Sequence, residues 1–195
     1  FMNEDDPFIV FKEWMSEAEK NEINDPNAVA LATVNESNQP DVRMVLLKEF
    51  NNKGFVFFTN LNSKKGIDLK TTPKASMCFH WKSLLRQVRI SGDISLISDI
   101  QADKYFNSRP YISRIGAWSS NQSKPMETRD AFLNKIDEYK KKFTDQNNVP
   151  RPKHWSGFLL SPYRIEFWKD VEGRLHQRLE YSRKSNSWEK QILYP

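Results

Sequence analysis

The chain has 195 residues, a net charge of +5 and few residues of the types that ligate metals or cradle phosphates: six glycines, three histidines and one cysteine. The lone Cys78 excludes an internal disulfide and a thiolate cluster, and the histidines lack zinc-ligand spacing, so no metal site is expected. The sequence contains no glycine-rich phosphate-binding loop. Any bound phosphate must therefore be held by side chains.

The length predicts a single domain over residues 1–195, because one domain usually takes roughly 150 residues. No stretch approaches the roughly 20 apolar residues of a membrane-spanning helix. The acidic first residues lack the basic-then-apolar pattern of a secretory signal, so we expect a cytoplasmic protein. Because Phe1 precedes Met2, residues 1–7 are expected to be disordered or to include an added residue.

The first part of the chain predicts one helix followed by short strands. Asp6 and Pro7 form a helix start, and apolar residues recur at helical spacing over 8–23. Strands are expected over 29–34, 43–50 and 55–59, with a hairpin turn at 51–54. A short helix over 63–71 is expected to stop before Pro73.

The remainder predicts strands over 74–81 and 87–96, then a helix that opens with a capping box of Ser98 and Gln101 and runs to about Asn107. A long loop over 110–125, an amphipathic helix over 129–143 and a polar linker over 144–153 follow. Closing strands are expected over about 157–168, 174–182 and 187–193. Consecutive strands with few intervening helices predict a mainly β fold, an antiparallel sheet or barrel with peripheral helices.

Positive charge is concentrated in one block of the chain. Between Arg43 and Gly92 there are ten Lys or Arg residues against two acids, Glu49 and Asp68. Such a block attracts anions, either a nucleic acid or a phosphorylated small molecule. A solvated basic face is the alternative, and charge alone does not choose between these interpretations.

Two motifs within the block suggest anion contacts. Arg43 and Lys48 end an apolar strand and, because strand side chains alternate, are expected to point to opposite faces and toward different anions. Lys64 and Lys65 follow Ser63 at a helix start, where lysines are unfavourable unless an anion lies between them. The alternatives are the charged ends of a core strand and a solvated lysine pair.

A third motif combines two hydroxyls with a guanidinium. Tyr105 and Arg109 are four residues apart and share one helix face, and Ser113 lies just beyond Pro110. These groups suit a phosphate. Ordinary surface residues would be equally compatible with the spacing.

A fourth motif lies in the predicted strand over 174–182. Arg174, His176 and Arg178 share one face there and would repel one another without an anionic or electron-rich partner. A solvent-facing edge is the alternative. Gln87 and Gln122 add amides that both donate and accept hydrogen bonds, as the rim of a heterocycle requires.

Taken in order, these segments resemble the pyridoxine/pyridoxamine 5′-phosphate oxidase family. The matching segments are RMVLLK at 43–48, FFTN at 57–60, SKK at 63–65, RQVRISG at 86–92, YFNSRP at 105–110, SRIGAWSSNQS at 113–123, EFW at 166–168 and RLHQR at 174–178. No single segment decides the resemblance, but eight in order, covering the chain from about Asp25 to its end, make it specific.

The resemblance implies an antiparallel FMN-binding split β-barrel that works as a homodimer with FMN at the subunit interface. The implied reaction oxidises pyridoxine or pyridoxamine 5′-phosphate to pyridoxal 5′-phosphate and reduces O2 to H2O2. The implied FMN-binding residues are Arg43, Met44, Val45, Leu46, Leu47, Lys48, Phe58, Thr59, Lys64, Lys65, Gln87, Gln122, Ser123, Trp168 and Arg178. The implied substrate-binding residues are Lys48, Tyr105, Arg109, Ser113, Arg174, Leu175 and His176, of which Arg174 and His176 are catalytic.

The chain departs from the family pattern in three places. Lys64 stands where the family usually has Arg, which keeps the charge but loses bidentate phosphate geometry. Gln177 replaces a common Asp and is expected on the opposite strand face from the ligands. The family often carries an N-terminal Arg- and Tyr-bearing segment over the substrate, which residues 1–7 are not expected to supply.

Two alternatives stay open at this point. Another split-barrel flavoprotein, such as a flavin reductase-like enzyme, would share most of these motifs but act on a different substrate. A nucleic-acid-binding domain would use the basic block with bases stacked on aromatic side chains. That second alternative gives no role to Tyr105 and Arg109 or to the RLHQR segment.

Overall fold

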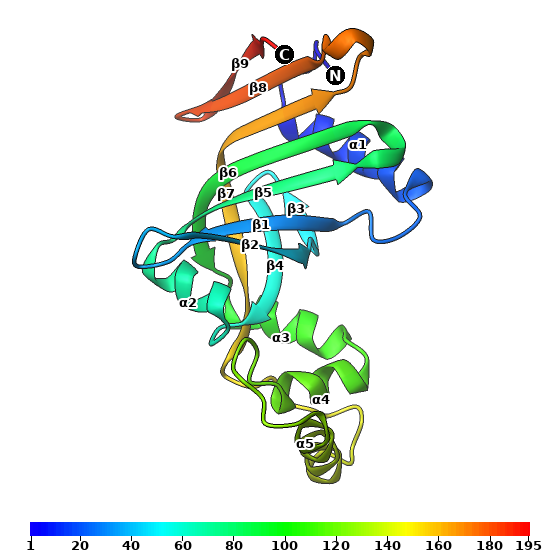
Figure 1. Cartoon of the computed structure of the whole chain (residues 1–195), viewed down its shortest axis with the longest axis vertical. Helices are drawn as coiled ribbons and strands as arrows, with labels where there is room; N and C mark the ends of the chain where they lie inside the picture. Colours follow the sequence, from blue (N-terminus) through cyan, green and yellow to red (C-terminus); the bar gives the residue numbers. More distant parts are fainter.

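The computed structural model describes residues 1–195 as one nine-stranded antiparallel sheet, curled into a half-barrel, with five α-helices at its periphery (Figure 1). The strands are β1 (Ala28–Val34), β2 (Pro40–Leu46), β3 (Glu49–Asn51), β4 (Gly54–Asn60), β5 (Lys74–Trp81), β6 (Arg86–Leu96), β7 (Trp155–Lys169), β8 (Gln177–Lys184) and β9 (Ser187–Leu193). The helices are α1 (Pro7–Asn21), α2 (Lys64–Thr71), α3 (Asp99–Ser108), α4 (Tyr111–Ser119) and α5 (Arg129–Lys142). The mainly β, antiparallel architecture is confirmed.

The long strand β7 organises the sheet. One of its edges pairs with β6 along nearly its whole length, while the other edge pairs with β4 over its first residues and with β8 over its last. The register of β6 against β7 shifts between Ser91 and Gly92, where a side chain at Gly92 would collide with the carbonyl of Ser161. β7 therefore carries the chain from the α3–α5 end of the molecule to the end that holds both termini (Figure 1).

Helix α1 covers the main core of the barrel. Its Asp6 side chain accepts from the Phe8 N–H, so the expected cap and the Pro7 start are both present. The predicted apolar face is buried as expected: Phe8, Phe11, Trp14, Met15 and Ala18. The Phe11 ring meets Phe55 and Phe79 edge-on at 4.9 and 5.3 Å between centroids, which ties the helix to the sheet.

A second, smaller core holds α3, α4 and α5 together at the lower end of Figure 1. Its buried members are Phe106, Ile115, Ala117, Val149 and Trp155. Trp155 is the first residue of β7 and packs edge-on against Phe106 at 5.1 Å. This contact fixes the helical lobe, which α3, α4 and α5 form, to the barrel. The candidate site lies at the junction of the lobe and the barrel.

Residues 1–7, for which disorder was expected, lie against α1 and the last two strands. The Phe1 ring contacts Trp14 edge-on at 5.0 Å, and Lys190 Nζ lies 2.6 Å from Asp5 Oδ1. The hydroxyl of Tyr181, a fully buried residue of β8, donates to the Glu4 carbonyl at 2.7 Å. Burial, reinforced by nearby carboxylates, raises the pKa of Tyr181 to about 12.

Tyr181 gives a pH-dependent stability prediction. Because the folded-state pKa is raised above its ordinary value of about 10, the neutral phenol stabilises the fold below pH 10, and this contribution is lost as pH rises toward 12. Tyr181→Phe should cost about 1 kcal/mol at pH 8 through the lost hydrogen bond. Between pH 9 and 12 the free energy of unfolding of the variant should fall by about 2 kcal/mol less than that of the unmodified chain. Urea unfolding at several pH values measures both, and parallel pH profiles would contradict the assignment.

The predicted strand over 43–50 is wrong as a single element. β2 ends at Leu46, where it pairs with Ala28 of β1. Leu47 then donates its N–H to the Asn27 carbonyl, while Lys48 donates to Val56 of β4. The chain thus changes its hydrogen-bonding partner at a corner of the barrel, and Lys48 lies after β2. Strand alternation therefore does not explain where the Lys48 side chain points.

Two further expectations are corrected. The predicted loop over 110–125 contains α4, which begins directly after the Pro110 that ends α3 and is held by an Arg114 Nη2 hydrogen bond to the Gln146 carbonyl at 2.6 Å. The strand predicted over 174–182 begins only at Gln177, because Gly173 and Arg174 both adopt positive φ in a tight turn. Arg174 and His176 therefore precede β8 and do not share a strand face with Arg178.

None of the five helices combines the length and the apolar character that crossing a membrane requires.

Candidate active site

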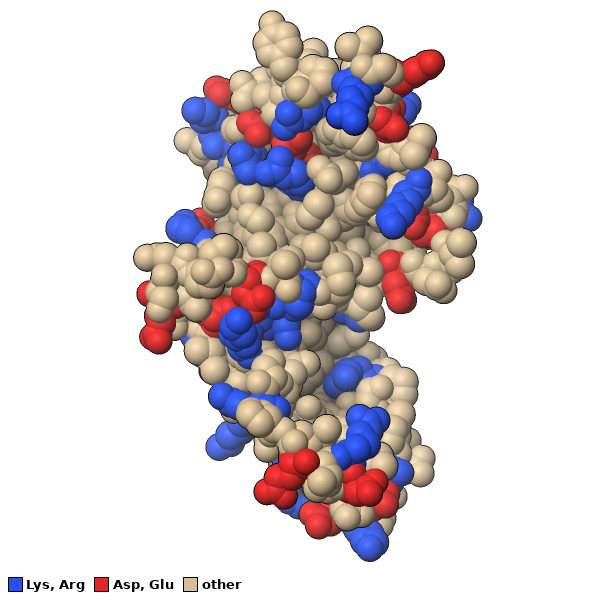
Figure 2. Space-filling view, in the orientation of Figure 1, with Lys and Arg blue, Asp and Glu red and all other residues tan.

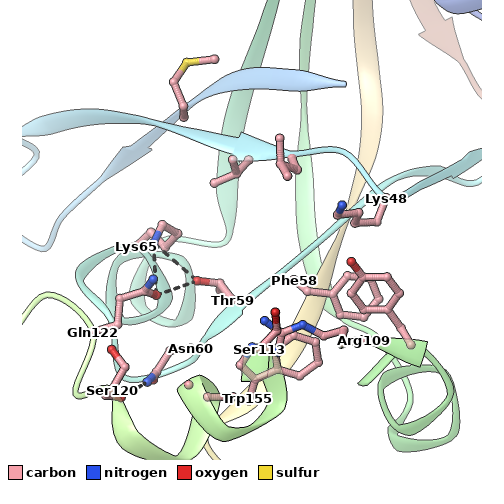
Figure 3. A pocket seen from close by; sticks show the side chains of 16 residues that line it. Lys48, Phe58, Thr59, Asn60, Lys65, Arg109, Ser113, Ser120, Gln122 and Trp155 are labelled. Carbon is pink, nitrogen blue, oxygen red and sulfur yellow. Dashed lines mark hydrogen bonds between the residues drawn. The ribbon is translucent and has the colours of Figure 1, made fainter. Parts of the chain in front are cut away.

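A pocket of about 470 Å³ lies where the helical lobe meets β2 and β4 (Figure 3). Eleven of the residues singled out from sequence line it: Met44, Val45, Leu46, Lys48, Phe58, Thr59, Lys65, Tyr105, Arg109, Ser113 and Gln122. They come from β2, β4, α2, α3, α4 and the loop after α4, so the fold brings together segments far apart in sequence. The pocket has two cationic ends joined by an apolar wall.

One end is built around Lys65, in the first turn of α2. Its Nζ lies 3.4 Å from both Thr59 Oγ1 and Gln122 Oε1. The residue is 9% exposed and makes no ion pair with a carboxylate. Burial, together with the nearby charge of Arg43, lowers the pKa of Lys65. A buried ammonium held only by neutral oxygens favours an anion as its missing partner.

The other end is built around Arg109, which directly follows α3. Its guanidinium lies over the Trp155 ring at 4.7 Å, and its buried Nη1 has no hydrogen-bond partner. Burial lowers the pKa of Arg109, since no carboxylate compensates for the lost hydration. Lys48, Ser113 and the stacked pair of Tyr105 and Phe58, 3.9 Å apart, line the same end. This end therefore suits a second anion.

The wall between the two ends comes from β2. Met44 and Leu46 line the pocket and are 63% and 38% exposed, so they offer apolar surface to a ligand. Val45 lines the pocket with them and also packs against the main core. The arrangement suits a ligand with a flat apolar body and an anionic group.

Four of the predicted cofactor residues near this region lie outside the pocket lining. Arg43 and Lys64 lie beside the Lys65 end, in a polar network with Asp41. Leu47 is buried in the main core. Ser123 has a backbone φ of +69° and lines a separate hollow between α4 and α5.

The remaining predicted residues form a second group, which we call the C-terminal cluster: Gln87, Trp168, Arg174, Leu175, His176 and Arg178. Gln87, Trp168 and Arg178 are direct partners across β6, β7 and β8, so they form one row on one face of the sheet. The His176 ring lies 4.6 Å from Trp168. Arg174 makes no ion pair, and Leu175 is 69% exposed.

Two contacts orient the cluster. The Nδ1 of His176 lies 2.8 Å from Asp170 Oδ1 and 3.4 Å from the Val171 N–H. Nδ1 donates to Asp170 when it carries a proton and accepts from Val171 when it does not, so one of these contacts holds the ring in either tautomer. Arg178 donates to Glu166 Oε1 at 2.9 Å, and this pairing raises the pKa of Arg178 and keeps it charged.

The pocket and the C-terminal cluster lie at opposite ends of β7. Trp155 lines the pocket, while Trp168 belongs to the cluster thirteen residues later in the same strand. At about 3.3 Å per residue this is roughly 40 Å along the strand. The pocket and the C-terminal cluster are therefore separate groups on one chain.

Five lining residues were not singled out from sequence: Asn60, Gly116, Ala117, Ser120 and Trp155. Asn60 lies in the FFTN segment and donates from Nδ2 to the Ser120 carbonyl at 3.2 Å. Trp155 follows a polar linker, and no local pattern marked it as a ligand contact. Its role depends on the packing of the lobe against β7, which spacing does not reveal.

The chain matches two family models. Residues 15–143 match the model described as pyridoxamine 5′-phosphate oxidase. Residues 155–195 match the pyridoxine 5′-phosphate oxidase C-terminal dimerisation region, which spans β7 to β9 and most of the C-terminal cluster.

Named relatives resemble this chain over nearly all of their length. The pyridoxine/pyridoxamine 5′-phosphate oxidase of Pelagibacter ubique is 58% identical over 196 residues, covering 100% of this chain and 94% of the relative. The protein of the same name from Allorhizobium ampelinum is 52% identical, with 100% and 95% covered.

Solved structures show the same fold. PhzG from Burkholderia lata, solved in complex with tetrahydrophenazine-1-carboxylic acid, has a TM-score of 0.93 at 28% identity, covering 99% of this chain and 94% of its own. An FMN-binding protein related to pyridoxamine 5′-phosphate oxidase from Nostoc punctiforme has a TM-score of 0.77 at 18% identity, with 97% and 98% covered. The split-barrel fold expected from the motifs is thus confirmed. With two family models matched along most of the chain and relatives above half identity, the chain belongs to the pyridoxine/pyridoxamine 5′-phosphate oxidase family.

Proposed function

We propose that this protein is an FMN-dependent oxidase that converts pyridoxine or pyridoxamine 5′-phosphate to pyridoxal 5′-phosphate and reduces O2 to H2O2. The observation that carries the proposal is the pocket with two uncompensated cationic ends, Lys65 and Arg109, on either side of an apolar wall. Two phosphate esters, one on the cofactor and one on the substrate, fit two such ends. Membership of the family supports the assignment.

The residues at the Lys65 end fit FMN. Lys65 and Arg43 supply charge for its phosphate, and Thr59 and Gln122 supply hydrogen bonds beside it. Met44 and Leu46 offer exposed apolar surface for the ring system. When bound, FMN supplies hydride acceptance from the substrate C4′ and transfer of two electrons to O2.

The Arg109 end fits the substrate phosphate. Lys48 and Arg109 contribute charge, and the hydroxyls of Tyr105 and Ser113 contribute further hydrogen bonds. Because this phosphate is remote from C4′, its binding positions the reacting carbon without taking part in the reaction. A flat pyridine ring suits the aromatic surface of Phe58 and Tyr105.

The C-terminal cluster completes the site from a second copy of the chain. The separation of the two groups along β7 supports a contribution from a second copy, because a two-fold dimer would bring the cluster of one chain to the pocket of the other. The match to a dimerisation region over residues 155–195 supports this assembly. Arg174 then orients the substrate and stabilises developing charge, and His176, held by Asp170, contacts the pyridine ring.

The visible spectrum of the purified protein tests the proposal. Flavin absorption bands are expected, with bleaching when pyridoxamine 5′-phosphate is added without oxygen and H2O2 formation when oxygen returns. A yellow protein that stays oxidised with both phosphorylated pyridines, but is bleached by a nicotinamide cofactor or a reduced phenazine carboxylic acid, would assign a different split-barrel reaction. A colourless protein that binds no FMN but binds oligonucleotides with steep salt dependence would contradict the flavin function.

A further inference from the structure

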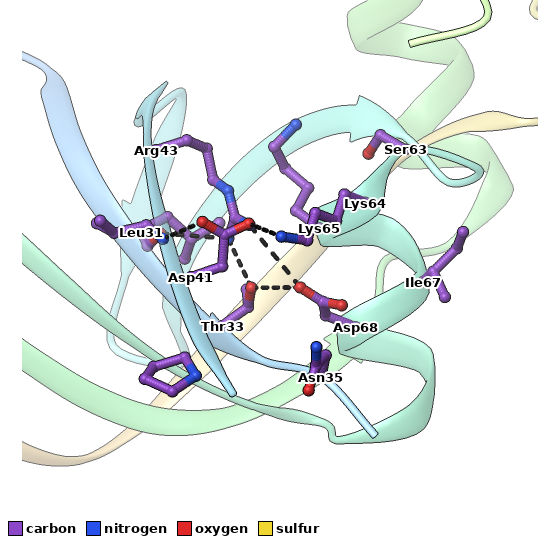
Figure 4. Close-up of polar contacts among 12 residues, drawn as sticks. Leu31, Thr33, Asn35, Asp41, Arg43, Ser63, Lys64, Lys65, Ile67 and Asp68 are labelled. Carbon is purple, nitrogen blue, oxygen red and sulfur yellow. Dashed lines mark hydrogen bonds and ion pairs between the residues drawn. The ribbon is translucent and has the colours of Figure 1, made fainter. Parts of the chain in front are cut away.

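A network of two carboxylates and two cations lies beside the Lys65 end of the pocket (Figure 4). Arg43 of β2 donates from Nη1 to Thr33 Oγ1 at 2.6 Å and pairs through Nη2 with Asp41 Oδ2 at 2.8 Å. Lys64 Nζ reaches the same Asp41 oxygen at 2.6 Å. Two cations that the flavin phosphate would use therefore already share one carboxylate oxygen.

The Asp41 side chain is 32% exposed. It is held only by the side chains of Arg43 and Lys64 and by the N–H of Val42, which donates to Asp41 Oδ1. The hydrogen bond from Lys64 lowers the pKa of Asp41, so the group stays ionised in neutral solution. A phosphate that binds Arg43 and Lys64 must compete with this negative charge, because Asp41 already contacts both cations. An exposed carboxylate can rotate away at low cost, because water replaces its contacts.

Asp68 of α2 differs from Asp41 in its burial. It is 4% exposed, and its Oδ2 accepts from Thr33 Oγ1 at 2.7 Å. The same oxygen lies 3.8 Å from Arg43 Nη2. Thr33, itself 1% exposed, thus connects the buried carboxylate to the guanidinium and fixes its orientation.

We propose that Asp41 is a displaceable carboxylate that occupies Arg43 and Lys64 until a flavin phosphate replaces it, and that Asp68, acting through Thr33, positions Arg43 during this exchange. This inference rests on the proposed FMN function and adds a determinant of affinity to it. It follows that Asp41 weakens FMN binding while Thr33 strengthens it. Neither residue should influence a flavin that lacks the phosphate.

The test compares FMN with riboflavin, which has the same ring system but no phosphate. Flavin-free protein is titrated with each, and quenching of flavin fluorescence gives the two dissociation constants. Asp41→Asn should tighten FMN about 5- to 10-fold, because it removes a negative charge near the phosphate, and should leave riboflavin within twofold. Thr33→Val, which keeps the side-chain shape, should weaken FMN about 10-fold and leave riboflavin within twofold.

Asp93→Asn is the matched control, since Asp93 pairs with Lys74 at 2.7 Å on the surface and its loss changes the net charge equally. It should change neither constant. FMN binding by Asp41→Asn that is unchanged or weaker would overturn the displacement role. Equal weakening of both flavins by Thr33→Val would overturn the positioning role, and if that variant does not fold, Asp41→Asn and its control decide alone. Failure of the unmodified protein to bind FMN would instead refute the proposed function.

Discussion

Arg109→Ala is expected to raise KM for pyridoxine 5′-phosphate about 100-fold and to change kcat only a few-fold. The guanidinium is buried against Trp155, with one nitrogen unpartnered and no carboxylate nearby, so a bound phosphate is its only strong partner. Charge-assisted hydrogen bonds of this type contribute about 1.5–3 kcal/mol, and about 2.7 kcal/mol corresponds to a factor of 100. Steady-state kinetics with purified dimer measures both constants.

Unphosphorylated pyridoxine provides the internal control for this prediction. It lacks the group that Arg109 is proposed to bind, so the variant and the unmodified enzyme should use it equally poorly. Arg109→Lys should recover part of the loss, since it restores charge but not the planar donor geometry. Arg129→Ala, on the exposed side of the same lobe, should have no effect. An equal loss with both substrates would show that Arg109 acts by supporting the lobe.

Local sequence patterns predicted the elements that local interactions determine. The Asp6 cap with Pro7, the Ser63 cap and the Ser98 cap each begin a helix where the pattern placed it. The 74–81 strand has the expected bounds, and its alternating burial reflects one face packed on the core. In each case the determining residues are neighbours in the chain.

Long-range contacts decided the elements that the sequence did not predict. The break at Leu47 arises because residues 40–46 pair with β1 while Lys48 pairs with β4, and no local residue announces a change of partner. Helix α4 is held by contacts to the 144–153 segment, including Trp118 Nε1 to the Pro150 carbonyl at 2.8 Å. Such contacts exist only once the lobe has assembled.

The candidate site shows the same division between features that local patterns predicted and features that long-range contacts decided. Motif residues identified both cationic ends of the pocket, because Lys65 and Arg109 stand in recognisable segments. No recognisable segment marks the residues that orient Arg43 beside the Lys65 end: Thr33 and Asp68 come from β1 and α2 and meet Arg43 only in the folded barrel. Sequence thus indicated candidate anion-binding groups, whereas the structure shows which neighbours position Arg43.

Arg174→Ala is expected to lower kcat about 100-fold, with a smaller change in KM. Arg174 makes no ion pair and lies exposed in the turn before β8, so its side chain is available to a ligand. Groups that stabilise developing charge at a reacting centre typically contribute 10²–10³-fold, about 3–4 kcal/mol. Pre-steady-state reduction of the bound flavin would show the loss in the chemical step.

Mixing the two variants tests whether the site is shared between chains. Co-expression of Arg109→Ala with Arg174→Ala chains should yield half heterodimers, in which one site carries both substitutions and the other carries neither. Activity should recover to roughly a quarter of the unmodified level, although each variant alone is nearly inactive at low substrate concentration. If Arg109 and Arg174 of one chain served the same site, every site in every dimer would carry a substitution and no activity would return. The roughly 40 Å of β7 between the pocket and the C-terminal cluster makes recovery the expected outcome.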